Sequence, residues 1–341
     1  MVLKGLVYLW LILAFGFGLS GSVSAQEPFF KGKTIRIIVG FAAGGGYDVY
    51  SRTIARHMGK QIPGNPVIVV ENMAGAGSLI SANHLYKAAR PDGLTIGHFI
   101  GGLFIQQILG KSGIEFDARR FEYIGVPTQD HYATGLSRES GITTVDQWMA
   151  VKTPIKFGGI APGTATSDIP RLLVATLGLP IQVIDGYKGT SQIRLAFNSG
   201  EVHGINNGWE STRSTWKNEV KSGKLVILLQ HFPSRHPELS NVPLDIEFAK
   251  TEEARKLLKV GAHSLGPTAR PFVLPPGTPK DRVQLLRKAF MATMKDPEFV
   301  AETQKANLDI TPADGAELER NVKEIFNLEP DLAAKLKEIL Q

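Results

Sequence analysis

Three consecutive glycines stand where an apolar run meets an amphipathic one. The stretch AAGGGYD, residues 42–48, follows TIRIIVGF and precedes VYSRTIARHMGK. Glycine weakens regular structure, so a triplet at such a junction marks backbone that turns sharply or approaches something closely. A helix that begins there also has free backbone amides at its first turn, which favour an anion. Gly44, Gly45 and Gly46 are therefore candidates for amides that surround a small negative group, with a tight turn as the alternative.

Two other loops share this form, in which a strand leads through small and hydroxyl residues into a helix. They are ENMAGAGS at 71–78 and GGIAPGTATSD at 158–168. In an open α/β sheet such loops lie at the carboxyl ends of strands, where ligands bind. The hydroxyl groups could instead only satisfy the start of their own helix. The candidate ligand contacts in these loops are Ala76, Ser78, Thr164, Thr166, Ser167 and Asp168.

The sequence contains no complete motif for nucleotide binding, metal binding or hydrolysis. The phosphate-loop candidates have Glu27 and Ile105 where glycine is needed, and the dinucleotide candidates have Val49 and Ile80 where a small residue is needed. There is no HExxH, no GxSxG and no cysteine. We therefore predict no catalytic residue, no metal and no cofactor, and this pattern favours a binding protein.

The first 25 residues read as a secretory signal. Lys4 precedes the uncharged run GLVYLWLILAFGFGL, and the small-residue stretch SGSVSAQ follows it. We predict cleavage after Ala25 and a periplasmic protein, with a retained membrane anchor as the alternative because the run is nearly long enough to span a bilayer. A lipoprotein is excluded because the chain has no cysteine for acylation.

The remaining composition is that of an ordinary globular protein. Of 341 residues, 43% are hydrophobic and 21% charged, and the formal net charge is +6. The basic residues are scattered and lack the aromatic platforms of a nucleic-acid interface, so no nucleic-acid partner is expected. The length allows two domains.

Short β-branched runs alternate with stretches of helical period, which favours α/β layers with largely parallel sheets. Predicted strands span residues 34–41, 67–70, 95–99, 121–126, 155–158, 182–184, 202–206 and 225–229. Predicted helices span residues 49–60, 79–89, 103–109, 145–151, 169–177, 191–198, 211–221, 279–294 and 313–340, the last broken at Pro330.

With these loops in view, the chain resembles the receptor family of tripartite tricarboxylate transporters, the Bug-type extracytoplasmic solute receptors. The likeness runs from KTIRIIVGFAAGGGYDVYSR through ENMAGAGSLISANHLYKAARPDGLTIG and GYKGTSQIRLAFNSGEVHG to LPPGTPKDRVQLLRKAF. The resemblance implies a two-lobed, type II-like Venus-flytrap periplasmic binding fold. It also implies a small organic carboxylate held between the lobes by backbone amides, and membrane permease subunits as partners of a monomeric receptor.

The resemblance also implies the domain limits. We predict a signal at 1–25, a first lobe formed by 26–128 together with 247–341, and a second lobe at 129–246.

Further site candidates follow from comparing this chain with the family pattern. Tyr47 replaces a small residue and could offer a ring face or a hydroxyl, so the ligand could be aromatic or a monocarboxylate. Asp48 is either a helix cap or part of the pocket wall. Lys188 could meet a second carboxylate or lie in a solvated turn. Asn207 and Trp209 could line the cleft from the second lobe, with ordinary packing as the alternative for Trp209.

Two other functions remain open at this point. A sensory receptor that signals to a membrane kinase would use the same pocket. A secreted hydrolase could use Asp48 or His203 as a base, but it would need a nucleophile or metal that the sequence does not offer.

Overall fold

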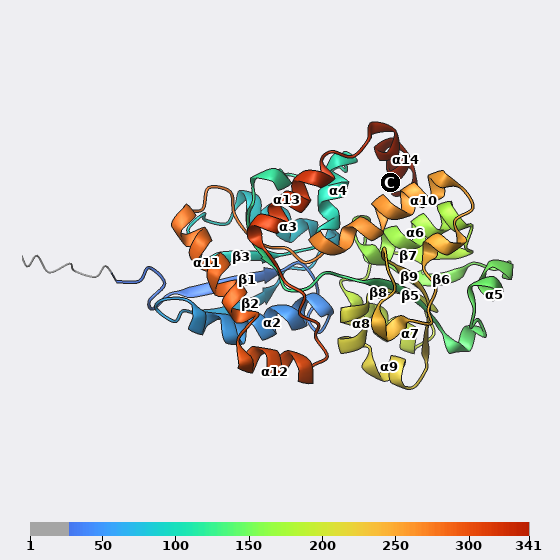
Figure 1. Ribbon diagram of the computed structural model, residues 1–341, viewed down its shortest axis with the longest axis horizontal. Coiled ribbons are helices and arrows are strands. Elements are labelled where there is room, and N and C mark those ends of the chain that lie inside the picture. Colours follow the sequence, from blue (N-terminus) through green and yellow to red (C-terminus); the bar gives the residue numbers. More distant parts are fainter. Residues whose placement is uncertain (1–26, 341) are drawn as a thin grey trace, which may run out of the picture.

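The chain folds into two α/β lobes that lie side by side, each built around one sheet (Figure 1). This arrangement is seen in a computed structural model, which describes residues 27–340. The predicted signal at residues 1–25 lies outside the described residues and stays a prediction.

The first lobe contains a six-stranded mixed sheet with the order β11-β4-β10-β3-β1-β2. β1 pairs in parallel with β2 and β3, whereas β10 is antiparallel to both β3 and β4. A strand from the C-terminal part of the chain therefore completes the middle of this sheet. The strands are β1 (Thr34–Val39), β2 (Val67–Asn72), β3 (Thr95–His98), β4 (Glu122–Val126), β10 (Phe272–Leu274) and β11 (Ala313–Asp314).

The second lobe contains a five-stranded sheet with the order β7-β6-β8-β5-β9. β6 runs parallel to β7 and β8, and β5 is antiparallel to β8 and β9. The strands are β5 (Tyr132–Ser137), β6 (Ile155–Gly158), β7 (Ile181–Ile184), β8 (Gly204–Gly208) and β9 (Leu225–His231).

Helices flank both sheets (Figure 1). Those near the first sheet are α2 (Gly46–Met58), α3 (Leu79–Lys87), α4 (Gly102–Ile108), α11 (Lys280–Thr293), α12 (Pro297–Lys305) and α13 (Gly315–Ile325). Those near the second sheet are α5 (Val145–Ala150), α6 (Ala165–Leu177), α7 (Thr190–Asn198), α8 (Trp209–Thr215), α9 (Lys217–Lys221), α10 (Glu252–Gly261) and α14 (Pro330–Leu340).

Two late helices pack on the second lobe. α10 and α14 both contact α6, and their apolar residues belong to the same buried cluster as Trp148 and Phe157. The chain therefore passes between the lobes near residues 127–131, 269–271 and 326–329. The predicted limits near 128 and 246 remain predictions, and the packing of α10 and α14 favours counting both helices with the second lobe.

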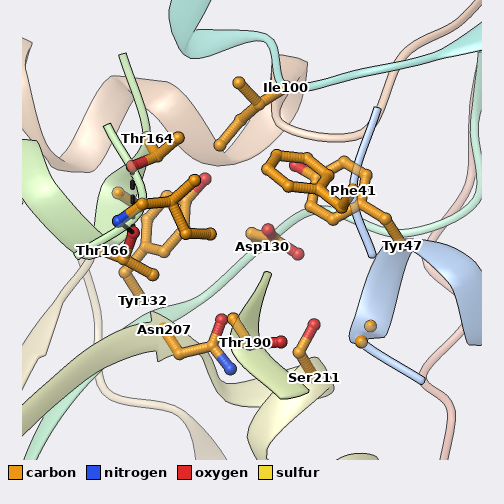
Figure 2. A pocket seen from close by; sticks show the side chains of 14 residues that line it. Phe41, Tyr47, Ile100, Asp130, Tyr132, Thr164, Thr166, Thr190, Asn207 and Ser211 are labelled. Atoms are coloured by element: carbon orange, nitrogen blue, oxygen red, sulfur yellow. Dashed lines mark hydrogen bonds between the residues drawn. The ribbon is translucent and has the colours of Figure 1, made fainter. Parts of the chain in front are cut away.

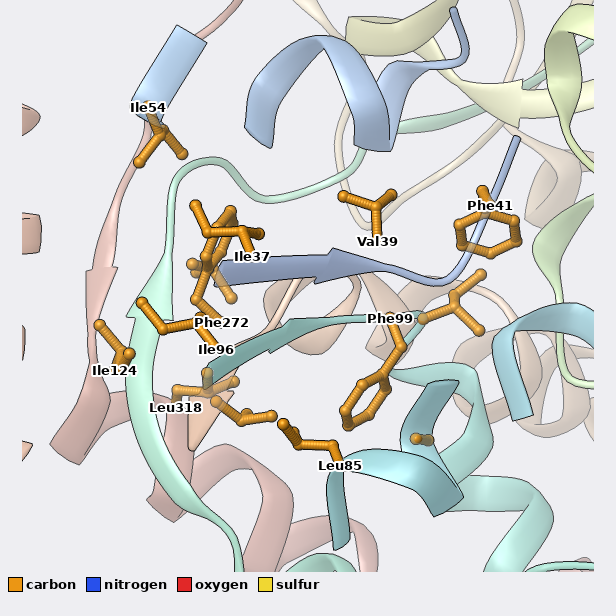
Figure 3. Close-up of a cluster of buried hydrophobic side chains, with 14 of the residues drawn as sticks. Ile37, Val39, Phe41, Ile54, Leu85, Ile96, Phe99, Ile124, Phe272 and Leu318 are labelled. Carbon is orange, nitrogen blue, oxygen red and sulfur yellow. The ribbon is translucent and has the colours of Figure 1, made fainter. Parts of the chain in front are cut away.

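The core of the first lobe forms from the alternation of buried residues along its central strands. Ile35 and Ile37 of β1 are fully buried, and Ile96 of β3 lies beside them (Figure 3). Phe272 of β10 stacks on the His98 ring with 4.1 Å between ring centroids and contacts Phe290 of α11. This short strand thus ties the C-terminal helices to the N-terminal sheet.

The predicted fold class is confirmed, but several elements differ from the prediction. The sheets are mixed, because the strands β5, β10 and β11, which were not predicted, pair antiparallel to their neighbours. β10 and β11 are three and two residues long, and β5 contains Gly135 in place of a β-branched run, so none gives a strong strand pattern. Helices α10 and α12 were also missed, although Thr251 and Asp296 cap them.

Other boundaries were close to the prediction. The predicted C-terminal helix is indeed broken, and Pro330 begins α14, where its fixed φ suits a first helical turn. Within residues 27–340, no helix has both the length and the apolar composition needed to cross a membrane.

We expect Phe272→Ala to destabilise the protein strongly, because it removes a fully buried ring where the C-terminal part of the chain joins the first sheet. Large-to-small changes of this kind cost about 3–5 kcal/mol. Denaturant unfolding would measure the loss. Val67→Ala on the edge strand β2, where the side chain is 64% exposed, is the matched control and should cost far less. Equal losses in the two variants would contradict this account of the core.

Candidate functional site

A cavity lies between the two lobes, where loops from both sheets meet (Figure 2). Its volume is about 30 Å³, so the lobes are closed around a small space. Its lining residues are Phe41, Gly45, Gly46, Tyr47, Ile100, Asp130, Tyr132, Ile160, Thr164, Ala165, Thr166, Thr190, Asn207 and Ser211.

The glycine loop forms one wall of this cavity. Gly44 has a φ of +77°, a conformation that glycine adopts without strain, and α2 begins two residues later at Gly46. The Gly44 amide donates to Asp48 Oδ2 (2.9 Å), and Arg52 and Asn72 also bind this carboxylate. Burial favours a higher pKa for Asp48, but these donors outweigh it and hold the pKa below the usual value. Asp48 therefore closes the loop by binding the amide of Gly44, which precedes the helix, and it does not line the cavity.

The glycine loop also touches the second lobe directly. The Ala42 amide donates to the carbonyl oxygen of Lys188 (3.0 Å), and Ser191 Oγ donates to the carbonyl oxygen of Ala43 (3.0 Å). A Cβ atom on Gly46 would overlap the Ser211 side chain. The absence of a side chain at Gly46 is thus what lets α2 approach α8 in the closed arrangement.

The loop before α6 forms the opposite wall. Thr164, Ala165 and Thr166 line the cavity at the first turn of α6. Thr164 Oγ1 donates to the carbonyl oxygen of Ala161 (2.6 Å) and lies 2.9 Å from Thr166 Oγ1. α7 begins at Thr190, which also lines the cavity. The N-termini of α2, α6 and α7 therefore face the same small space from both lobes.

Asp130 is the lining residue with a carboxyl group, and it is buried with Arg270 behind it. Arg270 Nε donates to Asp130 Oδ1, and Arg270 Nη2 donates to Ser211 Oγ (2.6 Å). Burial raises the pKa of Asp130, while Arg270 opposes the shift.

Aromatic rings form the apolar part of the wall (Figure 2). The rings of Phe41 and Tyr47 lie 4.6 Å apart between centroids. The Tyr47 hydroxyl donates to the carbonyl oxygen of Ala269 (2.6 Å), so this group already has a partner outside the cavity. Of the two contributions considered from the sequence, the hydroxyl is engaged, and the ring packs against Phe41, His98 and the Arg270 guanidinium group at the cavity wall.

The model of the tripartite tricarboxylate transporter family receptor matches residues 50–337. The chain belongs to this family. A curated relative, the UPF0065 protein in gbd 5'region of Cupriavidus necator, is 27% identical over 290 residues, which are 84% of this chain and 82% of the relative.

Solved structures of similar fold agree with the two-lobed architecture. The periplasmic binding protein BugD has a TM-score of 0.76 at 23% identity, covering 91% of this chain and 98% of that one. Rpa4515 of R. palustris, solved with adipate, has a TM-score of 0.73 at 20% identity, covering 90% of this chain and 98% of that one. Members of this family and these structural neighbours are solute-binding receptors and not enzymes.

In this receptor, the structure brings together only part of the predicted site. Six predicted residues line the cavity: Gly45, Gly46, Tyr47, Thr164, Thr166 and Asn207. Ser167 Oγ instead donates to Asp185 Oδ1 (2.6 Å), and the Asp168 carboxylate accepts from the Gly163 amide (2.9 Å). Gly44 also lies outside the lining set, although it shapes the loop.

The second loop and two residues of the second lobe lie away from the cavity lining. Ser78 Oγ accepts from the Ile100 amide (3.1 Å), and neither Ala76 nor Ser78 is a lining residue. Trp209 Nε1 donates to Glu238 Oε2 (2.8 Å) and its ring packs on Ala133 and Leu239, as in the packing alternative. Lys188 meets the glycine loop through its backbone carbonyl.

Eight lining residues were not predicted: Phe41, Ile100, Asp130, Tyr132, Ile160, Ala165, Thr190 and Ser211. Phe41, Ala165 and Thr190 adjoin loops that the sequence did single out. Asp130 lies in the segment that crosses between the lobes and Tyr132 begins β5, and no local pattern marks either position.

Two groups of the described residues have metal-ligand spacing, and neither lines the cavity. Asp296 and Glu298, which lie near His57, are both bound by the Lys60 ammonium group. In the other group, Glu210 accepts the His131 amide and Asp309 is paired with Arg213, while His236 lies near both. We assign no metal to either group.

Asp168 should make the stability of the protein depend on pH. Burial raises its pKa to about 7, although the Gly163 amide favours the ionised form. A carboxyl group whose folded pKa is raised binds more protons in the folded state, so stability falls as pH rises from about 4 to about 7. We expect Asp168→Asn to remove about 2–4 kcal/mol of this fall, at about 1.4 kcal/mol per pKa unit.

Urea unfolding between pH 4 and pH 7.5 would measure this effect. The exposed Asp146→Asn variant is the control and should retain the wild-type slope. A wild-type slope in Asp168→Asn would show that this carboxyl group does not titrate in that range.

Proposed function

We propose that this protein is a periplasmic receptor that binds a small organic carboxylate between its lobes and delivers it to a tripartite tricarboxylate-type membrane transporter. The observation that carries the proposal is the closed cavity on which the N-termini of α2, α6 and α7 converge. Backbone amides and the helix dipole at such termini stabilise an anion. Delivery to permease subunits, and a monomeric receptor, are supported by the family alone.

The proposed binding residues come from both lobes. Gly45 and Gly46 offer amides from the first lobe, and Thr164, Thr166 and Asn207 offer polar groups from the second. The remaining predicted residues shape these loops. Adipate in the similar structure Rpa4515 supports a carboxylate ligand for this fold.

Closure is the proposed mechanism of binding. A ligand held by groups of both lobes contacts all of them only in the closed form, so it stabilises that form by its differential affinity. The closed form is also the shape that would distinguish a loaded receptor from an empty one at the membrane. No catalytic step is required.

We expect Gly46→Ala to weaken carboxylate binding at least tenfold, because the new Cβ atom would overlap Ser211 when the lobes close. A panel of aliphatic and aromatic carboxylates, screened by thermal unfolding, identifies a ligand, since a compound that binds only the folded state raises its stability. Titration calorimetry then measures affinity for wild type and variant.

The double variant Gly46→Ala/Ser211→Gly is the matched rescue, because it removes the side chain that the new methyl group would meet. We expect it to recover most of the affinity. Unchanged affinity in Gly46→Ala would show that the observed closure is not the bound form. A stability shift with sugars, amines or nucleotides but with no carboxylate would overturn the proposed function.

A further inference from the structure

The charged side chains of the cavity wall limit which charged groups a ligand can have. Among the 14 lining residues of the described chain, Asp130 provides the only carboxyl group, and none is a lysine, arginine or histidine. A carboxylate in this cavity therefore depends on amides, hydroxyls and helix N-termini. These groups suit one negative charge and provide no cation for a second.

The nearest buried cation is engaged by the protein through two of its three nitrogens, whereas its Nη1 has no hydrogen-bond partner among the described residues. The guanidinium group of Arg270 is 1% exposed, binds Asp130 through Nε and donates to Ser211 through Nη2. Its centre lies 4.7 Å from the ring centroid of Tyr47 and 4.9 Å from that of Tyr50. Arg270 thus lies behind the cavity wall and offsets the charge of Asp130, which leaves that wall without net positive charge.

A second carboxylate group on the ligand would lie beside Asp130 in a space from which most water is excluded. The site would then hold two buried carboxylates against the single guanidinium group of Arg270, which is already paired with Asp130. A buried like charge without a counter-ion of its own is unfavourable, and such contacts commonly provide discrimination between ligands. A hydrogen-bond donor on the ligand would instead be favoured beside Asp130, because the carboxylate has acceptor positions left. An ionised carboxylate has about four acceptor positions, and Arg270 and the Tyr132 side chain occupy two of those of Asp130.

The rest of the wall fits an apolar ligand body. Phe41, Ile100 and Ile160 line the cavity together with the rings of Tyr47 and Tyr132. In Figure 2, Asp130 lies between the Phe41 and Tyr47 rings on one side and Tyr132 on the other. The ligand body is therefore placed among apolar side chains, with Asp130 as an acidic acceptor beside it.

We infer that Asp130 determines specificity in this receptor, selecting a monocarboxylate with an apolar body and a hydroxyl, amide or amine donor, and excluding dicarboxylates. This inference rests on the proposed function. It assigns Asp130 to the recognition of the second polar group of the ligand, while the helix N-termini hold the single carboxylate.

Matched ligand pairs test the inference on the wild-type protein. The pairs are 6-hydroxyhexanoate with adipate and 4-hydroxybenzoate with terephthalate, each differing in one end group, and calorimetry gives each affinity. We expect the hydroxyl compound of at least one pair to bind about tenfold or more tighter than its dicarboxylate, a factor typical of one discriminating polar contact. Dicarboxylates that bind as tightly as their partners or tighter in both pairs overturn the inference but leave the proposed function intact. If no carboxylate binds, both the inference and the proposed function are overturned.

Variants then test whether Asp130 causes the preference for the hydroxyl compounds over the dicarboxylates. Asp130→Asn should reduce the preference to about twofold or less, because the repulsive charge is gone. This change also leaves Arg270 unpaired, so Asp130→Asn/Arg270→Gln, which removes both charges, is made in parallel. Glu122→Gln is the control, since it removes a carboxylate that is paired with Lys280 and does not line the cavity, and it should keep the wild-type preference.

An unchanged preference in the folded Asp130 variants would overturn the assignment. If neither variant folds, the wild-type pairs decide the ligand class on their own.

Discussion

The buried contact between Asp130 and Arg270 joins the parts of the molecule that must be held in register. Asp130 lies in the segment at 127–131 and Arg270 in the segment at 269–271, both of which pass between the lobes. Arg270 also reaches Ser211 at the start of α8, and its guanidinium group faces the rings of Tyr47 and Tyr50 on α2. Buried ions are tolerated only when they are paired and hydrogen-bonded, so each of these neighbours constrains the position of the others.

A second buried network supports the opposite wall of the cavity. Asp245 contacts His231 (2.8 Å) and His263 (2.7 Å), and these two rings outweigh burial and lower the pKa of Asp245 to about 2. His231 in turn lies 2.7 Å from Thr134 Oγ1, which donates to Asn206 (2.8 Å). The Asn206 amide group then donates to the carbonyl oxygen of Ala165 (2.9 Å), a lining residue at the first turn of α6. A continuous chain of hydrogen bonds thus positions the α6 terminus.

The sequence revealed the features that depend on neighbours along the chain. Alternating strands and helices predicted the fold class, and the glycines and hydroxyl residues at strand ends predicted Gly45, Gly46, Thr164 and Thr166 as residues near the cavity. Each of these signals comes from backbone requirements within a few residues, which local patterns record.

Features that depend on distant partners were not predictable in this way. Asp130 and Arg270 are 140 positions apart, and each looks like a surface charge until the two crossing segments are brought together. β10 is recognisable as a strand only because β3 and β4 lie on either side of it. Likewise, Tyr47 has the same sequence context whether its hydroxyl or its ring meets the ligand, and only the position of Ala269 distinguishes the two.

The direct contacts between the lobes explain why such a closed form can also open. Several of these contacts are single hydrogen bonds, such as Ala42 to Lys188, Ser191 to Ala43 and Lys111 to Pro162. A net hydrogen bond contributes about 0.5–1.5 kcal/mol, because the same groups bind water when they separate. Each of these three bonds can thus be exchanged for bonds to water when the lobes separate. The helix N-termini and Asp130 face the same space, so under the proposed function the balance between open and closed forms would respond both to a carboxylate and to the chemistry of the group that accompanies it.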